Sequence, residues 1–178
     1  MSSKKKERPN LYIVGFMGTG KSSVGRLVGD KLGMISIDSD SEIENSVGWP
    51  ISEIFQKLGE ARFRELELDF IVEGHPDSGC VVACGGGMVT QPGLAELLNR
   101  KGVVVCLYAS VQTILKRTSI NQNRPLLNTS DPAKRIRNLM LERKAAYEKC
   151  GSRISTDNLD IQEVADCVSE VYSDRIGA

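Results

Sequence analysis

The fold of this chain is decided by one stretch, Gly15-Phe16-Met17-Gly18-Thr19-Gly20-Lys21-Ser22. The stretch matches G-x-x-x-x-G-K-S, the pattern of the phosphate-binding P-loop. Glycines in such a loop let the backbone wrap tightly and point successive N–H groups at an anion. Lys21 can then reach the β- and γ-phosphates, and the hydroxyl of Ser22 can ligate Mg²⁺. The stretch therefore predicts a nucleotide-binding site formed by Gly18, Thr19, Gly20, Lys21, Ser22 and Ser23.

The residues on both sides of the loop support this interpretation. Leu11 to Val14 form a short apolar run rich in β-formers, which is typical of a buried strand. After the loop, apolar residues recur at helical spacing and a glycine ends the run: Val24, Leu27, Val28, Leu32 and Gly33. The N-terminus of such a helix carries a partial positive charge, so it favours phosphate at the loop.

Apolar strands alternate with helices along the rest of the chain. Strands are expected at 11–14, 34–37, 80–84, 103–108 and 153–156, with helices at about 21–32, 41–48, 51–58, 60–73, 90–100, 110–118, 131–150 and 160–174. This alternation predicts an α/β fold of three layers, a five-stranded parallel sheet with helices on both faces. Ligands of such sheets bind beyond the carboxyl ends of the strands, where the P-loop, Asp38 with Asp40, and Gly85 to Gly87 are all expected.

Composition limits the classes of protein to which the chain can belong. Its 178 residues fit one domain. The 23 basic and 23 acidic side chains give no net charge, so we expect neither a nucleic acid nor a membrane as partner. The five cysteines are an odd number that suits free thiols in a reducing compartment, which predicts a cytoplasmic protein. The basic residues at 1–9 are expected to form a flexible tail.

Asp38 and Asp40 lie two residues apart at the end of a predicted strand. Alternation would place both carboxylates on the same side, where one could hold Mg²⁺ through water and the other could accept a hydrogen bond from a hydroxyl substrate. The structural alternative is a helix N-cap followed by an acid in the first turn. These two residues alone do not separate the two interpretations.

Glu60, Arg64 and Glu67 follow one another at the spacing i, i+4, i+7. They could form a surface ion-pair ladder, in which each pair is worth about 0.2–0.5 kcal/mol. They could instead orient the guanidinium of Arg64 so that its planar fork receives a ligand carboxylate.

Three consecutive glycines, Gly85 to Gly87, follow a predicted buried strand. Such a run is costly in backbone entropy, and close approach of the backbone to a ligand is the best reason for it; a loose loop is the alternative. Arg117, Arg124 and Arg143 are candidate phosphate or substrate contacts, although each alone could be a solvated charge. Arg124 lies in a long irregular segment of the kind that closes as a lid over a transferring phosphate.

In combination these motifs resemble those of shikimate kinases, within the nucleoside-monophosphate-kinase-like group of P-loop kinases. The resemblance runs from about Leu11 to Val171. It rests on the order and spacing of the P-loop, Asp38-Ser39-Asp40, Ile54-Phe55, Gly59-Glu60, Phe63-Arg64 with Glu67, Gly85-Gly86-Gly87, Arg124-Pro125-Leu126-Leu127, and Glu142-Arg143 with Tyr147.

The resemblance implies ATP-dependent phosphorylation of the 3-hydroxyl of shikimate, giving shikimate 3-phosphate and ADP in aromatic amino-acid biosynthesis, with Mg²⁺ as cofactor. It implies a monomeric enzyme of one domain, with a substrate-binding helical segment at about 38–74 and a lid at about 119–129. The alternatives are another small-metabolite kinase of this fold, such as a gluconate kinase, and a non-catalytic nucleotide-binding protein. A gluconate kinase has less need of two carboxylate-binding arginines beside a pair of aspartates.

The resemblance also implies a role for each candidate residue. Lys21 and Arg124 would bind the transferring phosphate, and Ser22 and Asp38 would hold the Mg²⁺. Asp40 would bind the shikimate hydroxyls and act as the base, Arg64 and Arg143 would bind the carboxylate, and Gly86 and Gly87 would make backbone contacts to shikimate. Arg117 would contact the adenine ring.

Overall fold

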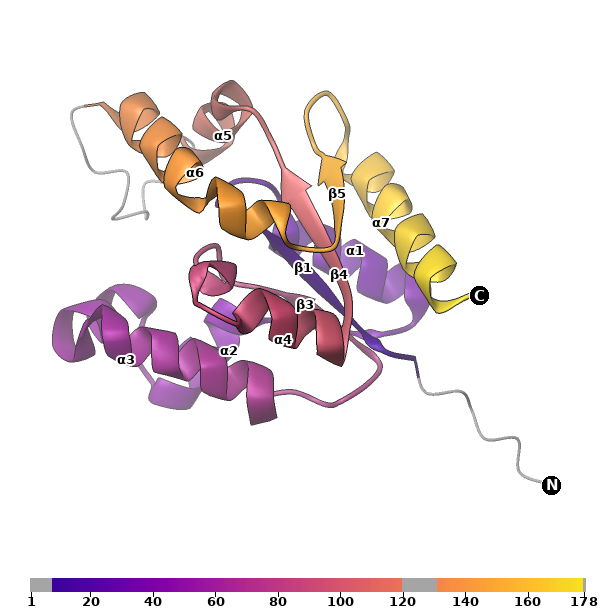
Figure 1. The fold of residues 1–178 in the computed structure, drawn as a ribbon, viewed down its shortest axis with the longest axis horizontal. Coiled ribbons are helices and arrows are strands. Elements are labelled where there is room, and N and C mark those ends of the chain that lie inside the picture. The colour runs from indigo at the N-terminus through magenta and orange to yellow at the C-terminus, as the bar shows by residue number, and fades with distance from the viewer. Residues whose placement is uncertain (1–7, 120–130, 178) are drawn as a thin grey trace.

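The computed structural model describes residues 8–119 and 131–177 (Figure 1). Its strands are β1 (Asn10–Gly15), β2 (Ile35–Asp38), β3 (Cys80–Ala83), β4 (Gly102–Tyr108) and β5 (Ser152–Ser155). Its helices are α1 (Lys21–Leu32), α2 (Ser39–Val47), α3 (Ile51–Glu73), α4 (Leu94–Lys101), α5 (Val111–Thr118), α6 (Pro132–Glu148) and α7 (Ile161–Ile176), with a short 3₁₀ helix η1 (Met88–Thr90).

The five strands form one parallel sheet in the order β2-β3-β1-β4-β5. The central strand β1 pairs with β3 and β4, so that Leu11 lies opposite both Val81 and Val103. Every residue of β1 and β3 is buried, which explains why these strands are continuous apolar runs instead of alternating ones. The predicted α/β fold, with a five-stranded parallel sheet, is confirmed.

Helices cover both faces of this sheet (Figure 1). Leu11 and Ile13 of β1 pack in a cluster with residues of α1 and α7, whereas Tyr12 and Val14 pack in a cluster with residues of α3 and α4. Successive side chains of a strand point to opposite faces, so β1 contributes to both cores. Within the described ranges, no helix has the length and apolar character needed to span a membrane.

The break expected at Gly59 is confirmed: α3 consists of two helical stretches that meet at a kink, where Gly59 has φ 80° and ψ 168°. Another element differs from the prediction. The helix expected at 90–100, with Thr90 as its cap, is wrong at its start: α4 begins at Leu94 after Gly93, which has φ 80°. Pro92 explains the shift, because it disfavours helical geometry in the preceding residue, and Gln91 is extended at φ −73° and ψ 136°.

The first described residues, Arg8 and Pro9, are hydrogen-bonded to the rest of the fold. The Arg8 carbonyl accepts a hydrogen bond from the Gly79 amide at 2.8 Å, and the Pro9 carbonyl accepts one from the Tyr172 hydroxyl at 2.7 Å. Residues 1–7 of the expected tail lie outside the described residues. The same holds for the expected lid segment beyond Ser119, and therefore for Arg124.

Candidate active site

The P-loop connects β1 to α1 at the carboxyl edge of the sheet. Gly18 and Gly20 adopt φ values of 77° and 95°, in the left-handed region that other residues avoid. The loop is held from within, because Thr19 Oγ1 and Lys21 Nζ both donate to the Phe16 carbonyl, at 2.7 and 3.1 Å. In the described part of the chain no side chain caps the first turn of α1. Its N–H groups can therefore bind an anion, as the sequence predicts.

Ser22 and Asp38 lie side by side next to this loop. Ser22 Oγ donates to Asp38 Oδ2 at 2.5 Å, and the other oxygen, Asp38 Oδ1, accepts hydrogen bonds from the amides of Asp40 and Ser41. Asp38 is thus the N-cap of α2 and also faces the P-loop, so the structural and functional interpretations hold together. Both residues line a pocket of about 450 Å³, together with Arg26 and others.

The donor set of this pair fits Mg²⁺. A hydroxyl and a carboxylate are hard oxygen ligands, and Mg²⁺ commonly takes only one or two carboxylates while phosphates and water complete its shell. Among residues 8–119 and 131–177, no group of three or more histidine, cysteine, aspartate or glutamate side chains forms a complete metal site.

Asp40 lies in the first turn of α2 and is half-buried. Asp40 Oδ1 and Glu67 Oε1 are both buried, and neither has a hydrogen-bond partner within the described residues. The two oxygens lie close to Gly85, since a Cβ on that glycine would meet them at 2.5 and 2.9 Å. Burial, and then the neighbouring Asp38, raise the pKa of Asp40, while Lys21 opposes the shift. A carboxylate in this environment has gained basicity, which suits a proton acceptor.

Arg64, on α3, is held by two acids of its own helix. Its Nη1 donates to Glu67 Oε2 at 2.7 Å, and its Nη2 donates to Glu60 Oε1 at 2.8 Å. Glu60 is 67% exposed, but Glu67 is only 1% exposed, so this group is more than a surface ladder. The guanidinium rests against Gly87, where a Cβ would lie 2.7 Å from Nη1. The absence of a side chain at Gly87 therefore lets Arg64 reach the glycine loop.

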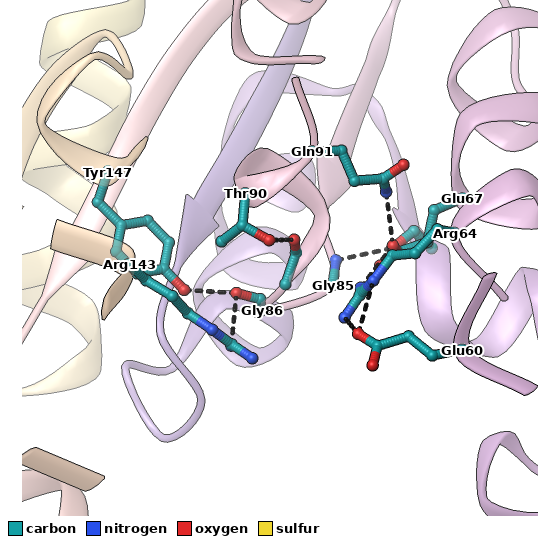
Figure 2. A network of polar contacts seen from close by, with 11 residues as sticks. Glu60, Arg64, Glu67, Gly85, Gly86, Thr90, Gln91, Arg143 and Tyr147 are labelled. Carbon is teal, nitrogen blue, oxygen red and sulfur yellow. Dashed lines mark hydrogen bonds and ion pairs between the residues drawn. The ribbon is translucent and has the colours of Figure 1, made fainter. Parts of the chain in front are cut away.

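Arg143, on α6, approaches the same loop from another element. Its Nη1 donates to the Gly86 carbonyl at 3.3 Å, and the hydroxyl of Tyr147, one turn further along α6, donates to the same oxygen. Figure 2 shows Arg143 and Tyr147 meeting Gly86 on one side of the loop and Arg64 lying on the other. The structure thus brings two arginines, 79 positions apart in the sequence, to one three-glycine segment.

Arg117, on α5, joins the P-loop to the end of β5. Its guanidinium donates to the Gly18 carbonyl at 3.3 Å, to Thr156 Oγ1 at 2.8 Å and to the Thr156 carbonyl at 2.9 Å. Next to it, Asp157 accepts hydrogen bonds from Thr113 Oγ1 at 2.5 Å and from the Ser110 amide at 2.9 Å, and these contacts lower the pKa of Asp157. Arg117 therefore lies beside the P-loop, on the side where α5 and β5 meet.

Sequence reasoning missed three residues of this region. Thr156 and Asp157 fix Arg117 and the start of α5, but a Ser-Thr-Asp run after a short strand has the composition of an ordinary turn. Gln91 donates from Nε2 to Glu67 Oε2 at 2.8 Å, and no local pattern marks it, since its partner lies 24 positions earlier. Of the predicted residues, Arg124 alone lies outside the described ranges.

Comparison with known proteins identifies the family to which the chain is similar. The family model described as shikimate kinase matches residues 17–173. The shikimate kinase of Thermodesulfovibrio yellowstonii is 43% identical over 163 residues, covering 92% of this chain and 94% of that protein. The shikimate kinase of Halorhodospira halophila is 43% identical over 165 residues, covering 93% of this chain and 85% of that protein.

Solved structures also include shikimate kinases similar to this chain. Shikimate kinase from Acinetobacter baumannii, in complex with shikimate, superposes with a TM-score of 0.88 at 37% identity and 94% coverage of both chains. A gluconokinase from Sinorhizobium meliloti has a TM-score of 0.59 at 16% identity, covering 96% of this chain and 95% of that one, and so shares the fold alone. Matching nearly its whole length to the family model and to these relatives, this chain belongs to the shikimate kinase family.

Proposed function

We propose that this protein transfers the γ-phosphoryl group of ATP to the 3-hydroxyl of shikimate, giving shikimate 3-phosphate and ADP. One observation carries the proposal: Arg64 and Arg143 flank the glycine loop, whose Gly85 adjoins the buried Oδ1 atom of Asp40. Two guanidinium groups suit an acceptor that carries a carboxylate, and a buried carboxylate suits a hydroxyl. The related Acinetobacter baumannii enzyme in complex with shikimate supports the choice of substrate.

In the proposed reaction, catalysis comes mainly from positioning the two substrates and stabilising the charge of the transition state. Phosphoryl transfer needs its reactants in line and its developing charge neutralised, and little covalent work falls to the protein. Lys21 and the N-terminus of α1 would bind the phosphates, and Arg124 would contact the phosphoryl group in transfer. Ser22 and Asp38 would hold Mg²⁺, which supplies charge neutralisation at the phosphates. Arg117 would contact the adenine ring, beside the P-loop.

Asp40 would accept the hydrogen bond, and then the proton, of the attacking hydroxyl. Asp40→Asn keeps a hydrogen-bonding side chain of the same shape but removes the base, so we expect kcat to fall by about 10²–10⁴-fold, the usual contribution of a general base. ATP affinity should change little. Steady-state kinetics with each substrate varied in turn would check this, and a loss of ATP affinity with normal shikimate kinetics would refute the role.

Arg64 and Arg143 would bind the carboxylate of shikimate from two sides. Glu60 and Glu67 use three of the five N–H groups of Arg64, which leaves one on each terminal nitrogen for a bidentate contact. Gly86 and Gly87 would offer backbone contacts to the ring between the two arginines. Shikimate recognition would then depend on local cations, because the protein has no net charge.

A coupled assay of ADP release over a panel of hydroxy acids tests the proposed function. Shikimate should be by far the best acceptor, and the product should carry its phosphate on the 3-oxygen, as ³¹P–¹H coupling in an NMR spectrum would show. A preference for gluconate would establish the alternative small-metabolite kinase. Nucleotide binding without turnover of any acid would establish a non-catalytic nucleotide-binding protein.

We also propose that the protein acts as a monomer in the cytoplasm. All five cysteines are free, and four of them are buried, which suits a reducing compartment. Light scattering coupled to gel filtration would give a mass near 19.5 kDa for a monomer.

A further inference from the structure

Gln91 reaches into the carboxylate-binding region from outside the helix that carries Arg64. It follows η1 and precedes Pro92, and its backbone is fixed on both sides: its amide donates to the Met88 carbonyl at 3.2 Å, and its carbonyl accepts from the Leu94 amide at 3.2 Å. Its side chain donates to Glu67 Oε2 at 2.8 Å (Figure 2). Gln91 therefore ties the segment after the glycine loop to α3.

The oxygen that Gln91 contacts is the one that holds Arg64. Glu67 Oε2 accepts from both Gln91 Nε2 and Arg64 Nη1, while Glu67 Oε1 has no hydrogen-bond partner within the described residues. Two donors on one oxygen define the rotation of the carboxylate. With a single donor, the two oxygens of Glu67 could exchange places, and the guanidinium of Arg64 would lose its fixed orientation.

Glu60, the other acid on Arg64, is a weaker anchor. It is 67% exposed and lies on the same helix, so its side chain is restrained mainly by the guanidinium that it contacts. Exposed ion pairs contribute little and hold their geometry loosely. The buried Glu67, at 1% exposure, carries the orientation of Arg64, and what fixes Glu67 matters more than what touches Glu60.

We propose that Gln91 is a positioning residue for the substrate carboxylate: it fixes Glu67, and Glu67 fixes the fork of Arg64 against the glycine loop. This inference rests on the proposed function, since it assigns Arg64 to a carboxylate. Gln91 touches neither substrate nor reacting atoms, and it acts through Glu67. Because it lies four residues after Gly87, it also keeps Arg64 in register with the loop that faces the substrate.

Two substitutions at Gln91 separate hydrogen bonding from mere packing. Gln91→Ala removes the donor and the side chain. Gln91→Glu has nearly the same shape but replaces the donor by a second carboxylate facing Glu67. This variant can still be assayed if the Gln91→Ala protein does not fold. The matched control is Gln162→Ala on α7, which also removes an amide that donates to a carboxylate, Asp166 Oδ1, on an exposed surface.

We expect Gln91→Ala to raise the KM for shikimate about three- to tenfold, the loss expected for one hydrogen bond of ordinary net strength, and Gln91→Glu to raise it further. The KM for ATP should stay within about twofold, and Gln162→Ala should match the parent in both. In a Glu67→Gln background, Gln91→Glu should cost less than in the parent, because the exchanged pair can again hydrogen-bond.

The inference is overturned if both Gln91 variants keep the parent KM for shikimate, if the KM for ATP rises equally, or if the effects of Gln91→Glu and Glu67→Gln simply add. Assaying the parent first distinguishes this failure from failure of the proposed function. A parent that does not phosphorylate shikimate refutes the function, and the inference with it. A parent that does so, alongside unaffected Gln91 variants, refutes the positioning role alone.

Discussion

Asp38 shows how one side chain can serve both local structure and the site. Its two oxygens divide the work: Oδ1 caps α2, and Oδ2 accepts from Ser22 beside the P-loop. The sequence offers a helix cap and a metal ligand as alternatives, but a carboxylate has enough acceptor positions for both. Residue identity thus predicts the chemistry of Asp38, and only the fold shows which group each oxygen contacts.

Tyr147 gives a test at the level of one hydroxyl group. Its hydroxyl donates to the Gly86 carbonyl, and burial raises the pKa of Tyr147 to about 12, so it remains a donor at neutral pH. Tyr147→Phe should raise the KM for shikimate about threefold or more by loosening the glycine loop, while the KM for ATP is unchanged.

Tyr172→Phe is the matched control for this experiment. Tyr172 also donates to a backbone carbonyl, that of Pro9 at 2.7 Å. It packs in the cluster formed with residues of α1 and α7, which does not include the glycine loop. Both variants should lose about 1 kcal/mol of stability. If both, or neither, change shikimate kinetics, Tyr147 has no specific role at the glycine loop.

Elements of the fold were predictable to the extent that their causes are local. Gly59 and the P-loop glycines are read correctly, because a helix break and a tight turn depend on backbone freedom at those positions. The start of α4 is misplaced because Thr90 has the composition of a cap, whereas Pro92 sets the geometry. Gln91 is missed altogether, since its partner Glu67 lies on α3, 24 positions earlier in the sequence, and is brought near only by the tertiary fold.

The kink in α3 yields a prediction at the level of the element. Gly59 has φ 80° and ψ 168°, a region nearly exclusive to glycine, whereas Gly48 ends α2 at φ 78° and ψ 13°, which other residues tolerate better. Neither position has an atom within 4 Å of an added Cβ, so strain alone distinguishes them.

Gly59→Ala should therefore destabilise the protein by about 1–3 kcal/mol, and by more than Gly48→Ala. Urea unfolding of the two variants and the parent measures the difference. Equal losses would mean that α3 straightens at no cost, and the kink would then not be needed to place Glu60 and Arg64.

Across the whole molecule, the sheet separates two polar centres. The candidate active site lies at the carboxyl ends of the strands, and a second network lies at the start of β1. There Asn10 Nδ2 donates to the Pro76 carbonyl at 2.7 Å, and Asn10 Oδ1 accepts from the Cys80 amide at 2.8 Å. His75 packs between the rings of Tyr12 and Phe70, at centroid distances of 5.6 and 5.3 Å.

This second centre makes stability depend on pH. Burial lowers the pKa of His75 below 6.5, an effect that the Pro76 carbonyl and Asp77 oppose and Lys101 reinforces. Below pH 6.5 the unfolded chain therefore binds a proton more readily than the folded one, so stability rises with pH across that window and falls as the pH drops through it. Each unit of pKa difference corresponds to about 1.4 kcal/mol.

His75→Gln should flatten this dependence. The unfolding free energies of parent and variant are measured at about pH 5.5 and pH 8, below and above the ordinary histidine pKa. The parent should lose more stability than the variant when the pH is lowered. Buried acids such as Asp40 and Glu67 are common to both proteins, so their contributions cancel in the comparison. Equal losses in parent and variant would show that His75 does not govern the acid response.

The most direct test of the whole account compares shikimate with its methyl ester as acceptors. If Arg64 and Arg143 bind the carboxylate, the ester should lose about 10²-fold or more in kcat/KM, because it is uncharged and cannot accept the charge-assisted hydrogen bonds that two guanidinium groups donate to a carboxylate. Arg64→Lys and Arg143→Lys keep the charge but lose the fork, so each should raise the KM for shikimate and narrow the preference for acid over ester. A parent enzyme that phosphorylates the ester as well as the acid would contradict the account.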